Sequence, residues 1–225
     1  MKKPVVDLKA FRLSRLSSPE YAHLKYLLGW VVYFIFYFLT ENLIPAETCH
    51  VMHCRLDDLI PFCEYFVIPY VFWYFLIVIT LYYLAGCHPE GFRQFMRFLI
   101  VTQVVAMAIY IFFPSRQDLR PASFAQDNLF TRLVGLLYAL DTNTGVCPSL
   151  HVAYSIGIVS AWCKERDVGR WWKCFVVIAA IFICLSTMFI KQHSALDFFA
   201  ALPLCALAEL IGYGKDAWFL RRRRG

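Results

Sequence analysis

Charged residues are scarce in this chain of 225 amino acids: Asp, Glu, Lys and Arg make up only 17% of it. A typical soluble domain carries about 25%. Hydrophobic residues reach 60%, and the mean hydropathy is +0.56. A soluble fold could not hide this excess, because about half of an ordinary protein surface is already apolar. The composition therefore excludes a disordered chain, a small secreted disulfide-rich protein and a typical soluble enzyme. It predicts a single domain whose main solvent is lipid.

The sequence also lacks the patterns that mark several other classes. It has no Cys-x-x-Cys pair, no internal repeat, and no low-complexity segment beyond the arginine run at 221–224. Its net charge of +6 comes without a basic stripe interleaved with aromatics, so we expect no nucleic-acid partner. Cys49, His50, His53 and Cys54 form a local cluster that holds a metal or a disulfide, or is an incidental loop; its spacing matches no standard zinc site.

Apolar runs predict a polytopic all-α bundle with six transmembrane helices, since a spanning helix needs about 20 mostly apolar residues. The predicted spans are residues 24–43, 61–84, 95–113, 149–162, 172–190 and 193–213. The fourth is short, so its polar first turn must sit in protein or water, and Pro203 should kink the sixth. Residues 127–140 carry an amphipathic pattern and are predicted to lie along the membrane surface.

The basic residues predict the orientation of the chain in the membrane. With six spans, five of the 22 Lys and Arg residues fall on one side of the bilayer: Arg55, Arg116, Arg120, Arg132 and Lys191. The excess on the other side predicts that both termini are cytoplasmic. The expected organisation is a basic segment at 1–22, a membrane domain at 23–213 and a basic tail at 214–225.

Three polar segments interrupt the apolar pattern, and all three fall on the predicted outer side. In the first, Arg116 and Arg120 are four residues apart and would share a face if the stretch were helical. Paired guanidiniums suit a phosphate dianion. The alternative is an outer loop with incidental arginines.

The second segment contains Ser149 and His151 at the start of the fourth span. A helix start offers free N–H groups and the positive end of the helix dipole, which favour an anion. A histidine hydrogen-bonded at the membrane interface is the alternative.

The third segment contains His193 and Asp197, which on a helix would lie on one face. The aspartate would accept the Nδ1–H of the imidazole and leave Nε2 as a nucleophile or base. A structural pair that ties two helices is the alternative. Lys191 adds positive charge beside them. Together the three segments supply the groups that are needed to cleave a phosphoester: cations, one imidazole to attack phosphorus and another to protonate the leaving oxygen.

In the order and spacing of these motifs the chain resembles the type-2 phosphatidic acid phosphatase family, which shares its site with vanadium haloperoxidases. Arg-Pro at 120–121 matches the end of the first motif, and Pro-Ser-Leu-His at 148–151 matches the second. Ser186, His193 and Asp197 have the spacing of the third. Phe113 and Thr187 stand where the family has lysine and arginine. Residues 114–115 and 58–62 look more like the branch that contains inositol phosphorylceramide synthases.

The resemblance implies a lipid phosphate phosphatase of the plasma or inner membrane, working at the outer leaflet without a metal or cofactor. His193 would form a phosphohistidine, Asp197 would orient it, and His151 would act as general acid. The implied phosphate-binding residues are Arg120, Arg116, Ser149, Ser186 and Lys191. The alternatives are an inositol phosphorylceramide synthase-like lipid phosphotransferase, an inactive member of the family, and a transporter in which His193, Asp197 and Lys191 relay ions.

Overall fold

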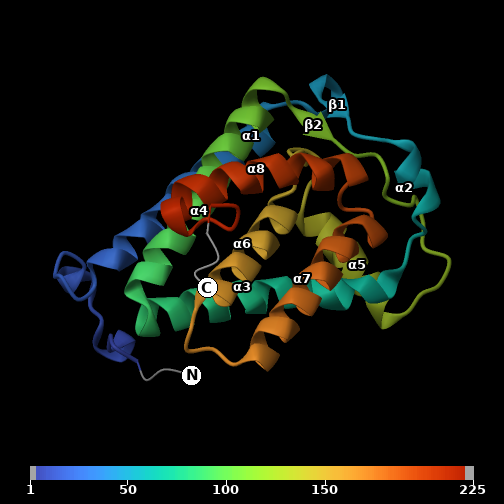
Figure 1. Cartoon of the computed structure of the whole chain (residues 1–225). Helices are drawn as coiled ribbons and strands as arrows, with labels where there is room; N and C mark the ends of the chain where they lie inside the picture. The colour runs from blue at the N-terminus through green and yellow to red at the C-terminus, as the bar shows by residue number, and fades with distance from the viewer. Residues whose placement is uncertain (1–3, 221–225) are drawn as a thin grey trace.

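The computed structural model describes residues 4–220, and within this range the chain is built almost entirely from helices (Figure 1). The α-helices are α1 (Leu28–Leu43), α2 (Arg55–Leu59), α3 (Val67–Cys87), α4 (Pro89–Phe112), α5 (Leu129–Leu140), α6 (Leu150–Lys164), α7 (Arg170–Phe189) and α8 (Ala195–Tyr213). Two short strands, β1 (His50–Val51) and β2 (Ser115–Arg116), pair in parallel. The prediction of an all-α fold is confirmed.

Five helical segments among the described residues are long and apolar enough to cross a membrane, which supports an integral membrane protein. They are Ala22–Leu43, Glu64–Cys87, Pro89–Phe112, Arg170–Phe189 and Ala195–Asp216. The sixth predicted span corresponds to α6, whose 15 residues extend about 22 Å, less than the roughly 30 Å hydrocarbon core. Six spans are therefore not established by helix length alone.

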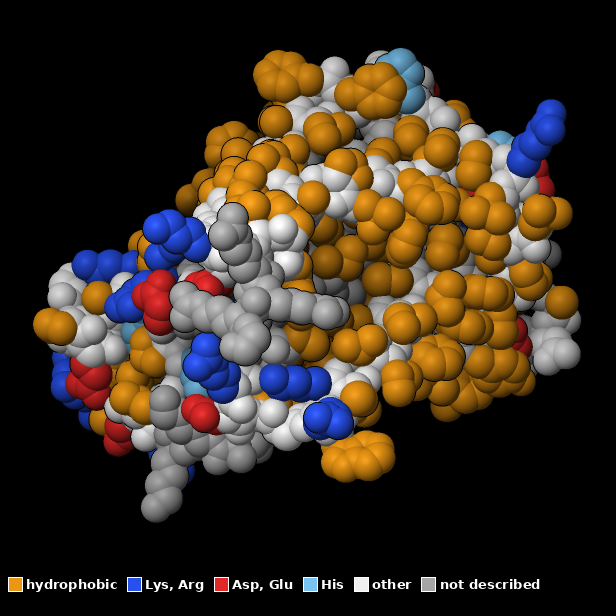
Figure 2. Space-filling view, viewed as in Figure 1, with side chains coloured by type: hydrophobic (Ala, Val, Ile, Leu, Met, Phe, Trp, Pro, Cys, Tyr) orange, Lys and Arg blue, Asp and Glu red, His pale blue; other side chains and the backbone are white. Residues whose placement is uncertain are grey.

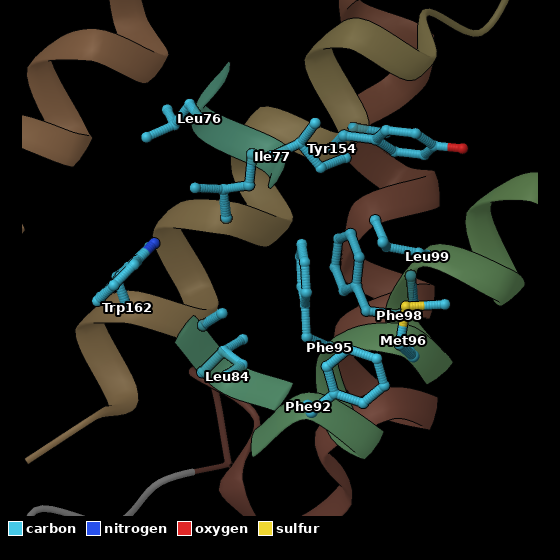
Figure 3. Close-up of a cluster of buried hydrophobic side chains, with 14 of the residues drawn as sticks. Leu76, Ile77, Leu84, Phe92, Phe95, Met96, Phe98, Leu99, Tyr154 and Trp162 are labelled. Carbon is cyan, nitrogen blue, oxygen red and sulfur yellow. The ribbon is translucent and has the colours of Figure 1, made fainter. Parts of the chain in front are cut away.

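The core of the bundle lies where α3, α4 and α6 meet (Figure 3). Helix α6 packs against α3, α4, α7 and α8, so most of its side chains are buried and few face the surroundings. Trp162 of α6 is 1% exposed, and its indole N–H donates to Thr80 of α3 at 2.8 Å. A helix enclosed in this way is covered by protein rather than lipid, which relaxes the length that lipid would otherwise require.

Small residues let α4 approach its neighbours closely. A Cβ added at Gly212 of α8 would lie 3.0 Å from the backbone nitrogen of Phe98, and one added at Gly157 of α6 would lie 2.6 Å from the ring of the same residue. Such contacts are typical of helices that pack in membranes, where van der Waals fit rather than water exclusion drives association.

Charged and apolar side chains separate on the surface (Figure 2). In that view most Lys, Arg, Asp and Glu side chains gather at the lower left, whereas hydrophobic side chains cover most of the remaining face. The basic residues predicted at 2, 3 and 221–224 lie outside the described residues. The segment before α1 packs on the end of α3, where the backbone N–H groups of Val5 and Val6 donate to Gly86 O at 2.8 and 3.0 Å.

The opposite end of the bundle carries β1, β2 and α2 at the upper right of Figure 1. Strand β2 pairs with β1 on one side, with His50 opposite Ser115, and Arg116 bridges to Thr144 on the other. Ser115 Oγ also accepts a hydrogen bond of 3.1 Å from the N–H of Cys147. The loop after α1, the loop after α4 and the loop before α6 are therefore fastened together at this end.

Candidate active site

A cavity of about 540 Å³ opens at this end of the bundle, between α1, α3, α6 and the loop that follows α5. Two of the predicted catalytic side chains, His151 and His193, line it. Its other polar lining includes Gln192, Asp141, Thr142 and Thr144. Much of the rest is aromatic.

His193 and Asp197 form the expected pair, but not on one helix. Helix α8 begins at Ala195 and its N-cap is Ser194, so His193 lies just before the helix. The predicted span at 193–213 therefore starts two residues too early. The Nδ1–H of His193 donates to Asp197 Oδ2 at 3.1 Å, and the N–H of Ser194 donates to the same oxygen at 3.0 Å. The capping box of α8 therefore holds the imidazole, because one carboxylate serves both helix and histidine.

A turn between α7 and α8 presents His193 to the cavity. The backbone N–H groups of Gln192 and His193 both donate to Thr187 O, at 2.9 and 3.0 Å. Lys191 adopts φ 55°, a left-handed conformation that is uncommon for a residue with a side chain. Thr187, which stands where the resembled family has arginine, thus shapes this turn through its carbonyl.

His151 lies opposite His193 because the starts of α6 and α8 are joined. The N–H of Ser149 donates to Asp197 O at 3.1 Å, and the two imidazole centroids are 5.7 Å apart. The His151 ring packs against Tyr70 and Trp73 at 4.7 and 4.5 Å. Among the described residues its Nε2 has no hydrogen-bond partner although it is buried.

Ser149 and Ser186 are bound to backbone. Ser149 is the N-cap of α6, as expected, and its Oγ accepts from the N–H of Val152 at 3.4 Å. Ser186 Oγ donates to Ile183 O at 2.6 Å within α7. Both residues are fully buried, and neither side chain belongs to the cavity lining. This placement gives them a structural role and does not support direct contact with a phosphate.

Arg116 and Arg120 do not share a helical face, because residues 115–116 form a strand and residues 117–121 are not helical. Strand pairing of Arg116 on both sides fixes this conformation. Its guanidinium pairs with Asp118 at 3.2 Å. The two arginines therefore do not converge on one point.

Arg120 binds backbone carbonyls at the end of α5 and in the loop that follows it. Its Nη1 donates to Tyr138 O and Asp141 O at 3.2 and 3.1 Å. Its Nη2 donates to Thr142 O at 2.8 Å and to Gln192 Oε1 at 2.6 Å. Burial lowers the pKa of this guanidinium, while the charge of Asp141 opposes the shift. Arg120 thus orients the amide of Gln192, a residue that lines the cavity. The Nε2 of Gln192 is buried and has no hydrogen-bond partner among residues 4–220.

Lys191 likewise binds backbone carbonyls. Its Nζ donates to Asp57 O at 2.9 Å and to Ile60 O at 2.5 Å. Burial lowers the pKa of Lys191, while the carboxylates of Asp57 and Asp58 oppose the shift. The ammonium therefore fastens the segment around α2 to the turn before His193, and its expected role in phosphate binding gains no support from this position.

Asp57 is an important residue that the sequence reading missed. It is 3% exposed, and it accepts hydrogen bonds from Ser194 Oγ at 2.6 Å and Ala195 N at 2.7 Å. Burial by itself raises the pKa of this carboxyl, but these hydrogen bonds outweigh it and the pKa is lowered. The signal in the sequence was an acidic residue beside an apolar run, which gives no indication of a partner 137 residues away.

The cysteine and histidine cluster is dispersed. Cys49 and Cys54 are free thiols, His50 stacks on Phe113 at 4.2 Å, and His53 pairs with Asp58 at 2.8 Å. Within residues 4–220, no group of three His, Cys, Asp or Glu side chains is arranged to hold a metal ion.

Comparisons of this chain with protein-family models, with curated proteins and with solved structures found no match. The site is therefore defined by its own side chains. It brings together an imidazole held by a carboxylate, a second imidazole with a buried nitrogen, and an amide N–H, all on one cavity. This set can attack an electrophile at one face and deliver a proton at another.

Proposed function

We propose that this chain is an integral membrane enzyme that removes or transfers the phosphoryl group of a lipid phosphate through a phosphohistidine. The observation that carries the proposal is the meeting of His193, held by Asp197, with His151 across one cavity, at a centroid separation of 5.7 Å. A histidine whose Nδ1 donates to a carboxylate keeps Nε2 unprotonated, which is the state that a nucleophile needs.

The reaction has two balanced halves. Nε2 of His193 forms a bond to phosphorus while the bond from phosphorus to the ester oxygen breaks, and protonated His151 gives its proton to that oxygen. In the second half, neutral His151 takes a proton from water or an alcohol, whose oxygen displaces His193 from phosphorus. The amide of Gln192, held by Arg120, is placed to donate to a phosphoryl oxygen.

We place six helices across the bilayer, with α6 enclosed by the others, both termini cytoplasmic and the cavity at the outer leaflet. The positive-inside rule supports this orientation. The end of the bundle with β1, β2 and α2 lies away from the segment that precedes α1 in Figure 1. The substrate would then reach the cavity from the outer leaflet.

A lipid phosphotransferase is the second candidate. Phe113 lies outside the cavity, and Thr187 is neutral, so the site has fewer cations than the resembled motifs provide. A site with weak binding of inorganic phosphate suits transfer to an alcohol, because the product is another ester. Product analysis with and without an added alcohol separates the two; full phosphate release without an acceptor argues against transfer.

The test is phosphate release from a panel of lipid phosphates by the purified protein in detergent. The His193→Ala variant should lose turnover and the acid-labile phosphoenzyme, and His151→Ala should slow turnover about 10²-fold or more. The control is His53→Ala, an exposed histidine that lies outside the cavity. Retained activity in both cavity variants refutes the mechanism. A wild-type protein without turnover on any ester leaves a transporter or an inactive relative as the remaining hypotheses.

A further inference from the structure

The cavity that holds the two histidines has an aromatic wall that phosphoryl transfer does not use. Six of its aromatic lining residues come from two helices: Trp30, Tyr33, Phe34 and Tyr37 of α1, and Trp73 and Tyr74 of α3. Neighbouring rings support one another, since Tyr33 stacks on Tyr37 at 5.8 Å and Trp30 packs on Tyr154 at 5.4 Å. The faces of such rings are electron-rich and attract cations.

A carboxylate lies beside this wall. Asp141 lines the cavity, is half-buried, and accepts a hydrogen bond of 3.2 Å from the hydroxyl of Tyr37. Across residues 4–220, the ion pairs of this structure do not include Asp141. Thr142 follows Asp141 in the chain, and its hydroxyl donates a hydrogen bond to the carboxylate of Glu41, which therefore lies close by. One acidic side chain therefore lines, and a second lies near, a cavity whose proposed ligand is an anion.

Burial of Asp141 favours a further positive group beside its carboxylate. Burial raises the pKa of this carboxyl, Glu41 adds to the rise, and the charge of Arg120 and the hydrogen bond from Tyr37 oppose it. A dianionic phosphate next to His193 would increase the repulsion further. A cation between Asp141 and the rings would offset it.

Unpartnered donors elsewhere in the cavity point to a bound ligand. Trp73 Nε1 and Gln192 Nε2 are buried without hydrogen-bond partners among the described residues, and these two residues are 8% and 3% exposed. Buried donors of this kind are normally satisfied. Phosphate oxygens would satisfy them, so the cavity offers donors and imidazoles on one part of its lining and carboxylate and aromatic faces on another.

We propose that this cavity takes a phosphate ester that also bears an ammonium group, with the phosphate at His193 and the ammonium between Asp141 and the ring of Tyr37. The inference rests on the proposed function and specifies its substrate class. Two sources share this chemistry. In a long-chain amino-alcohol phosphate, the bond that breaks joins phosphorus to the long-chain oxygen. In a zwitterionic glycerophospholipid, the phospho-amino-alcohol stays on His193 and diacylglycerol leaves.

The test uses two matched pairs of substrates that differ in the ammonium. Sphingosine 1-phosphate is compared with ceramide 1-phosphate, whose nitrogen is acylated and neutral, and phosphatidylethanolamine is compared with phosphatidylglycerol. The wild type should favour the ammonium member of at least one pair, which also identifies the source. In the Asp141→Asn variant kcat/KM should fall about tenfold for that member and should stay level or rise for its neutral partner.

Two further variants make the result specific. Asp141→Glu keeps the charge and should retain most of the preference, which separates charge from folding. Asp127→Asn removes an exposed carboxylate that pairs with Arg132 outside the cavity and should leave the preference unchanged. Equal losses for both members of a pair, or no preference in the wild type, overturn the proposal.

A binding measurement keeps this inference separate from the proposed function. Trp30 and Trp73 line the cavity, so its occupation should change tryptophan fluorescence. Phosphoethanolamine should give a saturable change that glycerol 1-phosphate does not match, and Asp141→Asn should abolish the difference. If the wild type turns over no ester but this difference is present, the proposed function fails and the ammonium site stands; equal responses to both probes overturn the site.

Discussion

Replacing Asp57 by alanine should destabilise the protein and disable its site together. The carboxylate accepts three hydrogen bonds, from Ser194 Oγ at 2.6 Å, Ala195 N at 2.7 Å and Cys54 N at 2.8 Å. Hydrogen bonds to a charged group contribute about 1.5–3 kcal/mol each, but they do not add fully because the carboxylate is desolvated. We expect a loss of about 3–5 kcal/mol, the usual cost of removing one partner from a buried charged contact.

The loss should be visible as a fall of at least about 6 °C in the apparent Tm of the detergent-solubilised protein, since 1 kcal/mol corresponds to about 2–4 °C at this chain length. Asp58→Ala is the matched control, because its side chain is 63% exposed and pairs only with His53 among the described residues. It should melt within about 2 °C of the wild type. In Asp57→Ala, kcat should also fall about 10–100-fold with little change in KM, because the turn that presents His193 loosens.

The pH dependence follows from the lowered pKa of Asp57. The folded protein keeps this carboxyl ionised to a lower pH than the unfolded chain does, whose Asp pKa is about 3.9. Its contribution is thus complete above that value and is lost as the pH falls through the lower folded-state pKa. The Tm difference between the wild type and Asp57→Asn should be constant from pH 5 to 7 and narrow below about pH 4. An Asp57→Ala protein that melts with the wild type, or an Asp58→Ala protein that is equally damaged, would refute the reasoning.

Three other substitutions test how the site is supported. Arg120→Lys should lower both Tm and kcat/KM, the latter about tenfold, because one ammonium cannot reach three carbonyls and Gln192 as the guanidinium does; melting and phosphate release measure the two effects. Lys191→Met should lower Tm while the inhibition constant for inorganic phosphate stays within about twofold, and a large rise in that constant would restore Lys191 as a phosphate ligand. Gly212→Ala should cost about 1–3 kcal/mol in a melting assay, because the new Cβ would lie 3.0 Å from backbone of α4, whereas Gly169→Ala, with open space around it, should change little.

The long helices could be located from the sequence because lipid imposes length and apolarity on a span. The predicted spans at 24–43 and 172–190 agree with helical segments Ala22–Leu43 and Arg170–Phe189 within about two residues. Helix α4 begins at Pro89, six residues before the predicted start, because a polar first turn can project beyond the apolar region. The length of α6 was the weakest expectation, since burial by neighbouring helices removes the constraint on which such predictions rest.

The histidines could be found as well, because spacing of four residues brings His193 and Asp197 together whether or not a helix contains both. The roles of the cations could not be found. Which carbonyl a guanidinium or ammonium reaches depends on loops that are distant in sequence: Lys191 Nζ reaches Asp57 O across 134 positions, and Arg120 reaches Gln192 across 72. A sequence gives the side chains, but it does not show which backbone carbonyls in loops lack a backbone hydrogen-bond donor. These carbonyls compete with any ligand for a cationic side chain.

That competition has a consequence for the ligand. Lys191 and Arg120 bind backbone carbonyls, and Arg116 is paired with Asp118, so these three cations are already engaged. A dianion entering the cavity would meet imidazole and amide donors, yet Asp141 would repel it, because Arg120 is already engaged with backbone carbonyls and a further positive charge is needed at the carboxylate. A ligand that brings its own ammonium supplies that charge at the carboxylate. Adding a cation from the protein instead, through Thr142→Lys beside Asp141, should shift preference towards neutral-headed phosphate esters in the paired substrate assay, and an unchanged preference would show that Asp141 does not sense the charge of the ligand.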